Sequence, residues 1–255
     1  MKGIILAAGR GSRMSGLTEE KPKCLVEIAG KPLLYWQLAA LRDAGIRELA
    51  VVCGYRAEMI EALSGRAPAA FTALLNPRWS ETNMLSTLFC AAEWAGGEEC
   101  IISYSDIVYP AGHVTALSGA PQALSITYDT LWEELWRIRQ EDPLDDAETF
   151  RAHDGVLEEI GGKPHSLEQV RGQYMGLIKI TPEGWRIIDR EKEILGEQIN
   201  KTDMTSFIRR LLANKMPVGA VPVAGRWCEV DNAEDLDAYT RRLAAKGWTH
   251  DWRDA

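Results

Sequence analysis

Residues 1–14, MKGIILAAGRGSRM, join a short apolar run to a glycine-rich turn. The run is rich in aliphatic and β-branched residues, which predicts a buried strand of a parallel sheet. The turn begins with Gly9 and Gly11 as in the dinucleotide motif G-x-G-x-x-G, but Met14 occupies the third glycine position. No G-K-[ST] follows at the spacing of a P-loop. The turn therefore predicts a ligand other than NAD, and the cations near it favour a polyanion: Arg10, Arg13, Lys21 and Lys23.

The composition narrows the class of protein. With 255 residues, of which 46% are hydrophobic and 26% charged, the chain can form one globular α/β domain with a sizeable core. The net charge is −8, yet residues 1–31 hold six basic and three acidic side chains. A cationic segment in an acidic protein favours a small phosphorylated ligand and argues against a nucleic-acid partner.

We expect a cytoplasmic protein with reduced thiols. No apolar run approaches the ~20 residues that span a bilayer, and the first residues lack the features of a signal peptide, so no membrane partner is predicted. The five cysteines form no C-x-x-C pair and the four histidines are dispersed, which predicts packed thiols and no zinc site. The oligomeric state is left open between monomer and homodimer.

Strand-like and helix-like segments alternate up to about residue 129. This alternation predicts a Rossmann-like, mostly parallel sheet with helices on both faces. Ligands of such sheets bind beyond the carboxyl ends of the strands, and these ends carry residues 9–13, Asn76, Asp106 and Asp129. The second half predicts an α+β elaboration that includes a hairpin turning at residues 154–155. The predicted strands of the first half are residues 2–8, 47–55, 71–76, 99–106 and 122–129.

Several motifs together carry a resemblance to a known family. They are LAAGRGSRM (6–14), KPKCLVEIAGKPLL (21–34), ETNMLSTLFCA (81–91), YSDIVY (104–109), GGKP (161–164), GQYMGL (172–177) and WCEVDNAEDL (227–236). The chain resembles the nucleotidyltransferases that join a nucleoside triphosphate to a phosphorylated small molecule and release pyrophosphate. Its later motifs are similar to the branch of phosphocholine and aminophosphonate cytidylyltransferases. The resemblance implies a glycosyltransferase-A-like fold for one domain, residues 1–255, with a nucleotide-binding half (1–128) and an acceptor-binding half (129–255).

The chemistry of this family explains which catalytic groups are expected. A phosphate monoester is largely dianionic at pH 7, with a second pKa of ~6, so its oxygen can attack the α-phosphorus without a general base. Cations must offset the repulsion between the two anions. The resemblance implies that Lys23 contacts the α-phosphate and that Arg13 binds the β- and γ-phosphates. It also implies that the nucleotide lies along Leu6, Ala7, Ala8, Gly9, Gly11, Ser12 and Ser105.

Three carboxylates are candidate ligands for Mg²⁺. Asp106 ends the fourth predicted strand, and Glu229 and Asp231 lie two residues apart, so both can point from one face of a strand to one ion. The competing interpretations are a turn or helix cap for Asp106 and an exposed strand edge for the other two.

Neutral polar residues around position 80 are candidates for reading the base. The resemblance implies base contacts near a helix start that carries Asn76, Thr82, Asn83 and Ser86. A helix cap formed by Asn83 is the competing interpretation. These residues leave the choice between CTP and UTP open.

Residues 128–148 are the candidate acceptor site. They hold eight acidic side chains, including Asp129 and Asp145, and only two arginines. Aromatic faces beside carboxylates favour an ammonium group through cation–π attraction and charge pairing. The competing interpretation is a solvated acidic helix whose tryptophans pack on the core. The candidate aromatic residues are Tyr128, Trp132, Trp136, Tyr174 and Trp227.

Lys163, within the GGKP motif, is the candidate for binding the acceptor's phosphate, because related transferases place a lysine near this point. An exposed hairpin lysine is the alternative. Taken together, the sequence predicts a Mg²⁺-dependent cytidylyltransferase that joins CTP to a small phosphorylated or phosphonate amino compound. The alternatives are a sugar-1-phosphate nucleotidyltransferase that uses UTP, dTTP or GTP, and a non-catalytic nucleotide-binding module.

Overall fold

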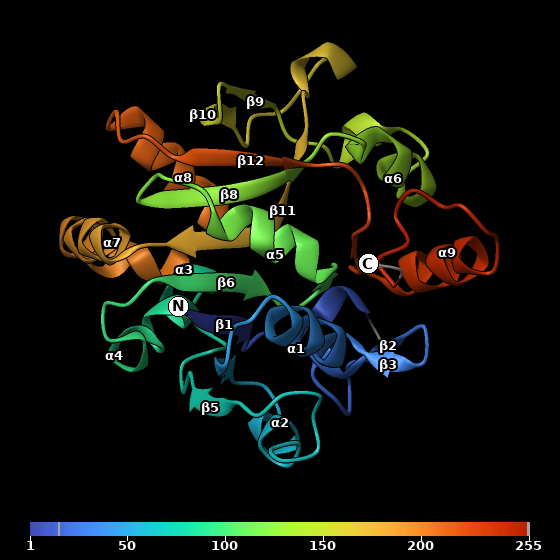
Figure 1. The fold of residues 1–255 in the computed structure, drawn as a ribbon, viewed down its shortest axis with the longest axis horizontal. Coiled ribbons are helices and arrows are strands. Elements are labelled where there is room, and N and C mark those ends of the chain that lie inside the picture. Colours follow the sequence, from blue (N-terminus) through green and yellow to red (C-terminus); the bar gives the residue numbers. More distant parts are fainter. Residues whose placement is uncertain (15, 254–255) are drawn as a thin grey trace.

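A nine-stranded sheet runs through both halves of the chain in the computed structural model, which describes residues 1–14 and 16–253 (Figure 1). The strands, in spatial order, are β5 (Thr72–Leu75), β4 (Glu48–Cys53), β1 (Lys2–Ala7), β6 (Cys100–Tyr104), β11 (Gln173–Ile180), β8 (Leu124–Asp129), β12 (Gly219–Val223), β10 (Val156–Ile160) and β9 (Phe150–His153).

Most of the sheet is parallel, as the alternation of segments predicts. β1 pairs in parallel with β4 and β6, and β12 pairs in parallel with β8. β11 lies antiparallel between β6 and β8, so β8 and β12 run in the same direction as β1. The carboxyl ends of β1, β4, β6, β8 and β12 therefore meet at one edge of the sheet, together with the start of β11.

Helices cover both faces of this sheet, which confirms the predicted fold class. Successive residues of β1 alternate between the two cores: Ile5 and Ala7 pack in one, and Ile4 and Leu6 pack in the other. One core takes α1 (Leu33–Asp43), α2 (Ala57–Glu61), α5 (Ala111–Ser118), α6 (Trp132–Arg139) and α9 (Ala233–Leu243). The other takes α3 (Met84–Phe89), α4 (Ala92–Ala95), α7 (Pro182–Leu195) and α8 (Met204–Ala213).

Two short antiparallel ribbons complete the fold. β2 (Glu27–Ile28) pairs with β3 (Lys31–Pro32), and β7 (Ile107–Val108) pairs with β13 (Cys228–Glu229). The hairpin of β9 and β10 turns at Asp154 and Gly155, whose φ values of 48° and 75° are those of a tight left-handed turn. This hairpin is where the sequence predicts it. No helix among residues 1–14 and 16–253 is long and apolar enough to cross a membrane.

Asp129 joins the end of β8 to the last part of the chain. Its fully buried carboxylate accepts hydrogen bonds from Gly225 N (2.7 Å) and Trp227 Nε1 (2.9 Å) and contacts His250 Nε2 at 2.9 Å. Burial alone would raise the pKa of Asp129, but the hydrogen bonds from His250 and Gly225 outweigh it and lower this pKa below its ordinary value. The carboxylate is therefore a structural anchor for the segment that carries Trp227.

We expect Asp129→Asn to lower the free energy of unfolding at pH 7 by about 2–4 kcal/mol, because the amide NH₂ faces the Trp227 donor inside the protein. The folded-state pKa of Asp129 is lowered, so its stabilisation is complete above the pKa of an unfolded aspartate, ~3.9, and is lost as the pH falls towards the folded-state value. Urea unfolding of both proteins between pH 7 and pH 3 measures the effect. The difference should shrink in acid, and Asp145→Asn, at an exposed carboxylate, should change stability by less than ~0.5 kcal/mol.

Candidate active site

The turn after β1 packs directly against the side chain of Lys23. Gly11 has a φ of +73°, and a Cβ at this position would lie 2.8 Å from Cβ of Lys23, so only glycine allows this close approach. Thr18 Oγ1 donates to Gly11 O at 3.0 Å and holds the turn from the other side. The backbone N–H groups of Gly9, Arg10 and Gly11 donate no hydrogen bond within the described residues. The turn therefore offers free donors to an anion.

Lys23 lies between two carboxylates that come from distant parts of the chain. Its Nζ is 2.8 Å from Oδ2 of Asp106 and 2.9 Å from Oδ1 of Asp231. Burial alone would lower the pKa of Lys23, but the two carboxylates outweigh it and raise this pKa above its ordinary value. Arg13, whose side chain is largely exposed, reaches the other oxygen of Asp231 at 3.1 Å. Both predicted phosphate-binding cations thus meet at one carboxylate.

The three predicted metal ligands lie together. The β7–β13 ribbon pairs Ile107 with Glu229 and thereby brings Asp106, Glu229 and Asp231 to one place, with one oxygen of each within 4.8 Å of the others. Oδ1 of Asp106 is buried and has no hydrogen-bond partner among the described residues. Carboxylate oxygens are the ligands that Mg²⁺ prefers, and a buried oxygen without a donor is open to a cation. The residues present therefore fit a divalent metal ion.

A buried arginine lies behind these carboxylates. The side chain of Arg139, at the end of α6, is 1% exposed and forms ion pairs with Glu229 (3.1 Å), Asp231 (3.2 Å) and Asp235 (3.3 Å). Burial alone would lower the pKa of Arg139, but Glu229 and the other acidic neighbours raise it. Sequence reasoning missed this residue. Its position, three residues after Trp136 and therefore on the same helix face, is the signal that could have found it.

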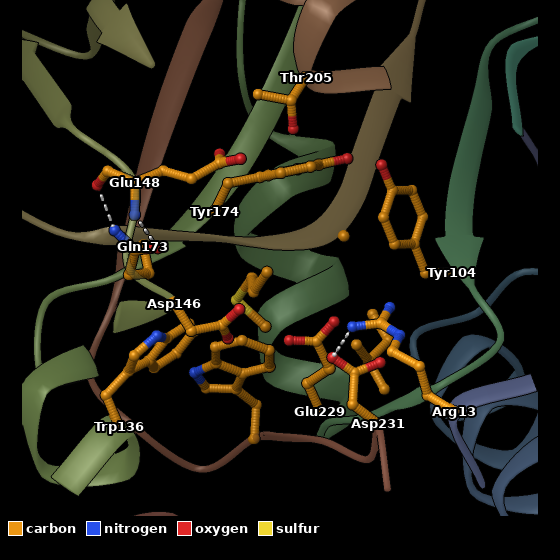
Figure 2. A pocket seen from close by; sticks show the side chains of 14 residues that line it. Arg13, Tyr104, Trp136, Asp146, Glu148, Gln173, Tyr174, Thr205, Glu229 and Asp231 are labelled. Atoms are coloured by element: carbon orange, nitrogen blue, oxygen red, sulfur yellow. Dashed lines mark hydrogen bonds and ion pairs between the residues drawn. The ribbon is translucent and has the colours of Figure 1, made fainter. Parts of the chain in front are cut away.

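A cavity of about 200 Å³ opens beside the three carboxylates. In Figure 2, Arg13, Glu229 and Asp231 lie on one side of it, and Glu148 and Tyr174 lie on the other. The structure brings three of the predicted acceptor residues here: Trp136, Tyr174 and Trp227. It also brings here Asp146 and Glu148, two of the acidic side chains of the candidate segment 128–148. Six further lining residues were not among the predicted site residues: Tyr104, Ile107, Gln173, Met175, Gly176 and Thr205.

A second, smaller hollow of about 130 Å³ lies between the turn after β1 and the start of α3. Trp79 forms one wall and is a further residue that sequence reasoning missed. The other lining residues include five of the predicted nucleotide-binding residues: Leu6, Ala8, Gly9, Thr82 and Asn83. The side chain of Asn83 also accepts from Met84 N as the cap of α3. Ala7 is buried within β1, and Ser12 and Ser105 flank the turn and Asp106 respectively.

Two predicted base-binding residues face the protein instead. Asn76 is buried, and its amide donates to Thr82 Oγ1 and Thr87 Oγ1 and accepts from Arg78 N. Ser86 Oγ donates to Ile199 O at 3.3 Å, on the far side of α3. Asn76 therefore contacts Thr82 and Thr87 in the wall of the hollow, but neither Asn76 nor Ser86 lines the hollow itself.

Five predicted acceptor residues lie outside the cavity. Trp132 is in the core and donates from Nε1 to Val170 O, and Asp129 is the anchor described above. Lys163 is exposed and donates to the carbonyls of Leu144 (2.6 Å) and Asp145 (2.8 Å). We therefore leave Trp132, Asp129 and Lys163 out of the proposed acceptor site, together with Tyr128, which packs on Phe150, and the exposed Asp145. Lys163 instead fixes the loop that leads to Asp146 and Glu148.

Comparison with known proteins identifies the class of protein to which the chain belongs. A family model described as a MobA-like NTP transferase domain matches residues 3–136, more than half of the chain. The chain belongs to this family and is a nucleotidyltransferase.

Its relatives differ in nucleotide and acceptor. The chain is 34% identical over 249 residues to the CTP:phosphoglutamine cytidylyltransferase of Campylobacter jejuni, covering 93% of this chain and 98% of the relative. It is 45% identical over 69 residues, 27% of this chain and 30% of the relative, to the N-acetylmuramate alpha-1-phosphate uridylyltransferase of Neisseria meningitidis. The inositol-1-phosphate CTP transferase of T. maritima shares the fold, with a TM-score of 0.76 and 17% identity over 95% of this chain and 94% of that structure.

We expect Arg139→Met to lower the free energy of unfolding, measured with urea in the presence of EDTA, by about 3–5 kcal/mol, because it leaves Glu229, Asp231 and Asp235 without their shared buried cation. Arg137→Met is the matched control. It removes an arginine two residues earlier whose partner is the exposed Glu133, and it should change stability by less than ~0.5 kcal/mol. Equal effects of the two substitutions would contradict a special role for the buried arginine.

Proposed function

We propose that this protein is a Mg²⁺-dependent cytidylyltransferase. It transfers CMP from CTP to the phosphate or phosphonate oxygen of a small amino compound and releases pyrophosphate. One observation carries the proposal: Lys23 joins the anion-binding turn to two of the three clustered carboxylates, next to a cavity with acidic and aromatic walls. The choice of CTP is supported by the relative from Campylobacter jejuni, which is similar along nearly the whole chain.

The turn after β1 is the proposed triphosphate site. The N–H groups of Gly9, Arg10 and Gly11, which donate no hydrogen bond within the described residues, are available to bind an anion. Lys23 and Arg13 add two full charges, of which Arg13 can leave Asp231 readily because it is largely exposed. The hollow beside Trp79 and Thr82 then lies next to this turn and is the proposed site of the cytosine.

Charge balance supports a single divalent ion at the carboxylates. Lys23, Arg13 and Arg139 face five carboxylates: those of Asp106, Asp146, Glu229, Asp231 and Asp235. When all are ionised, the cluster has two negative charges in excess, which is the charge that one Mg²⁺ neutralises. Bound through Asp106, Glu229 and Asp231, the ion would stabilise negative charge on the phosphates.

The acceptor's phosphate oxygen is itself the nucleophile in this proposal. The bond that it forms to the α-phosphorus replaces the bond to pyrophosphate, so no proton has to be removed from the nucleophile. The protein's part is to hold two anions in line and to stabilise the charge that develops on the leaving group. Lys23 is placed for this because its stem packs against Gly11 of the turn and its ammonium contacts Asp106 and Asp231.

The walls of the cavity support an amino group on the acceptor. Trp136 and Trp227 give it aromatic faces, and Asp146 and Glu148 give it carboxylates. Burial raises the pKa of Glu148, whose carboxylate forms no ion pair among the described residues. An ammonium group would supply the missing charge.

The decisive test is pyrophosphate release, measured with CTP, UTP, dTTP, GTP and ATP against phosphocholine, phosphoethanolamine, aminoethylphosphonate, phosphoglutamine, phosphoserine and glucose 1-phosphate. We expect activity with CTP and with at least one amino compound, abolished by EDTA and restored by Mg²⁺. Activity with glucose 1-phosphate alone would identify a sugar-phosphate nucleotidyltransferase instead. Binding of CTP without release of pyrophosphate from any pair would favour a non-catalytic module.

Lys23→Met should lower kcat by at least ~10²-fold, as removal of one group that stabilises transition-state charge does. Lys31→Met is the control, since that lysine is exposed and lies over the Trp36 ring. Steady-state rates at saturating CTP and Mg²⁺ measure the effect. An unchanged kcat for Lys23→Met would remove this lysine from the mechanism.

A further inference from the structure

A further cavity adjoins the cavity beside the carboxylates and extends away from them; it is distinct from the hollow beside Trp79, and we call it the second cavity. Its volume is about 300 Å³, and it shares the lining residues Tyr104, Glu148 and Thr205 with the first cavity. Its far wall is the start of α8 and Gly161 of the GGKP motif. The two cavities together therefore form a path that begins at Glu229 and Asp231 and ends beside Arg209.

Two opposite charges line this second cavity without pairing with each other. Glu148 is half-buried, and its carboxylate forms no ion pair among the described residues. The guanidinium of Arg209 donates one long hydrogen bond, 3.3 Å, to Gly161 O and has no carboxylate partner in the described part of the chain. Asp203, the other acidic residue of the wall, is engaged by Ser206 N (2.7 Å) and Ser206 Oγ (2.8 Å).

Neighbouring residues outside the cavity position both Glu148 and Arg209. Gln173 fixes the backbone of Glu148 on both sides: its Nε2 donates to Glu148 O at 2.6 Å and its Oε1 accepts from Glu148 N at 3.3 Å. Gly161 has a φ of +78°, and a Cβ there would lie 2.5 Å from Thr205 Cγ2 and 2.9 Å from Arg209 Cδ. Only glycine at this position lets the stem of Arg209 lie against the loop.

We propose that Glu148 and Arg209 form a subsite for a zwitterion, in which Glu148 binds the ammonium and Arg209 binds the carboxylate of an α-amino acid. The acceptor is then a phosphorylated amino acid, with its phosphate at the carboxylate cluster and its amino-acid end in the second cavity. This inference rests on the proposed function and narrows its acceptor. A phosphorylated amino alcohol or an aminophosphonate would satisfy Glu148 and leave the guanidinium without an anion, whereas an amino acid satisfies both.

The proposed subsite predicts that the protein prefers acceptors that carry a carboxylate. Phosphoserine and phosphoethanolamine differ only in the carboxylate, as do phosphoglutamine and its decarboxylated analogue. With CTP and Mg²⁺, we expect the wild-type protein to favour the carboxylated member of at least one pair by at least ~10-fold in kcat/KM, the effect of one charge-assisted hydrogen-bonded pair.

Arg209→Gln should remove this preference. We expect the KM of the carboxylated acceptor to rise by about 10- to 100-fold, with kcat, the KM of CTP and the kinetics of the decarboxylated partner nearly unchanged. Arg209→Lys should restore part of the loss, because it returns the charge without the planar fork. Arg137→Gln, which removes an exposed arginine of α6, is the matched control, and the thermal midpoint of each variant shows that it is folded.

Two kinetic outcomes would overturn the subsite: equal use of both members of each pair by the wild-type protein, or a loss in Arg209→Gln that is the same for both members. Failure of the proposed function looks different, because the wild-type protein would then release no pyrophosphate from any acceptor. In that case, calorimetric titration of phosphoglutamine and phosphoserine into the wild-type protein and Arg209→Gln still decides the matter. Weaker binding by Arg209→Gln supports the subsite, and equal or undetectable binding by both proteins refutes it.

Discussion

The ion pairs of Asp231 hold the site together. Its two oxygens are contacted by Lys23, Arg13 and Arg139, at distances between 2.9 and 3.2 Å. Burial alone would raise the pKa of Asp231, but these cations, Lys23 foremost, lower it below its ordinary value. Each of them comes from a different part of the fold: the turn after β1, the segment that follows it, and the end of α6. One buried carboxylate therefore joins residues 1–30 of the chain to α6 and to the segment after β13, and removing any partner leaves charge without compensation in a desolvated place.

The same cluster shows why the proposed reaction needs no proton acceptor. The cost of the reaction is the approach of two anions, so the useful groups are those whose charge does not depend on pH near neutrality. Neighbouring carboxylates raise the pKa values of Lys23 and Arg139, which keeps both side chains charged at any pH at which the protein is folded. Before substrates bind, the carboxylates hold these cations in position. The triphosphate can then take Arg13 from Asp231 at little cost, because the arginine is exposed and its ion pair is weak.

The sequence alone predicts part of the fold and part of the site, and there are physical reasons why it does not predict the remainder. The alternation of segments predicts the sheet, and the glycine-rich turn and Asp106 are expected to lie together because the ends of parallel strands meet at one edge. Glu229 and Asp231 reach the same place through the antiparallel β7–β13 ribbon. Residues that only long-range packing brings to the site escaped prediction, although most of them lie on strands or helices. Asp129 and Trp132 have the residue types of an acceptor site, but hydrogen bonds to the 225–250 region and to Val170 draw them inward. Glu148 and Arg209 lie 61 positions apart and line one cavity only because α8 packs on β10, and no local sequence pattern records that packing.

In the proposed function, the choice of acceptor depends on a few charged side chains that lie on a fold shared with other nucleotidyltransferases. The structural similarity to the T. maritima enzyme at 17% identity shows that this sheet persists when most side chains change. In the reaction proposed above, the carboxylate cluster would act on the phosphate that every acceptor shares, whereas the second cavity, which lies beyond the cluster, would contact the part of the acceptor that varies. The two tasks are joined at Glu148, Tyr104 and Thr205, which line both cavities. Arg209 lies on the far side of these residues and contacts none of the clustered carboxylates, so the proposed subsite predicts that a change there alters acceptor choice and leaves the cluster intact.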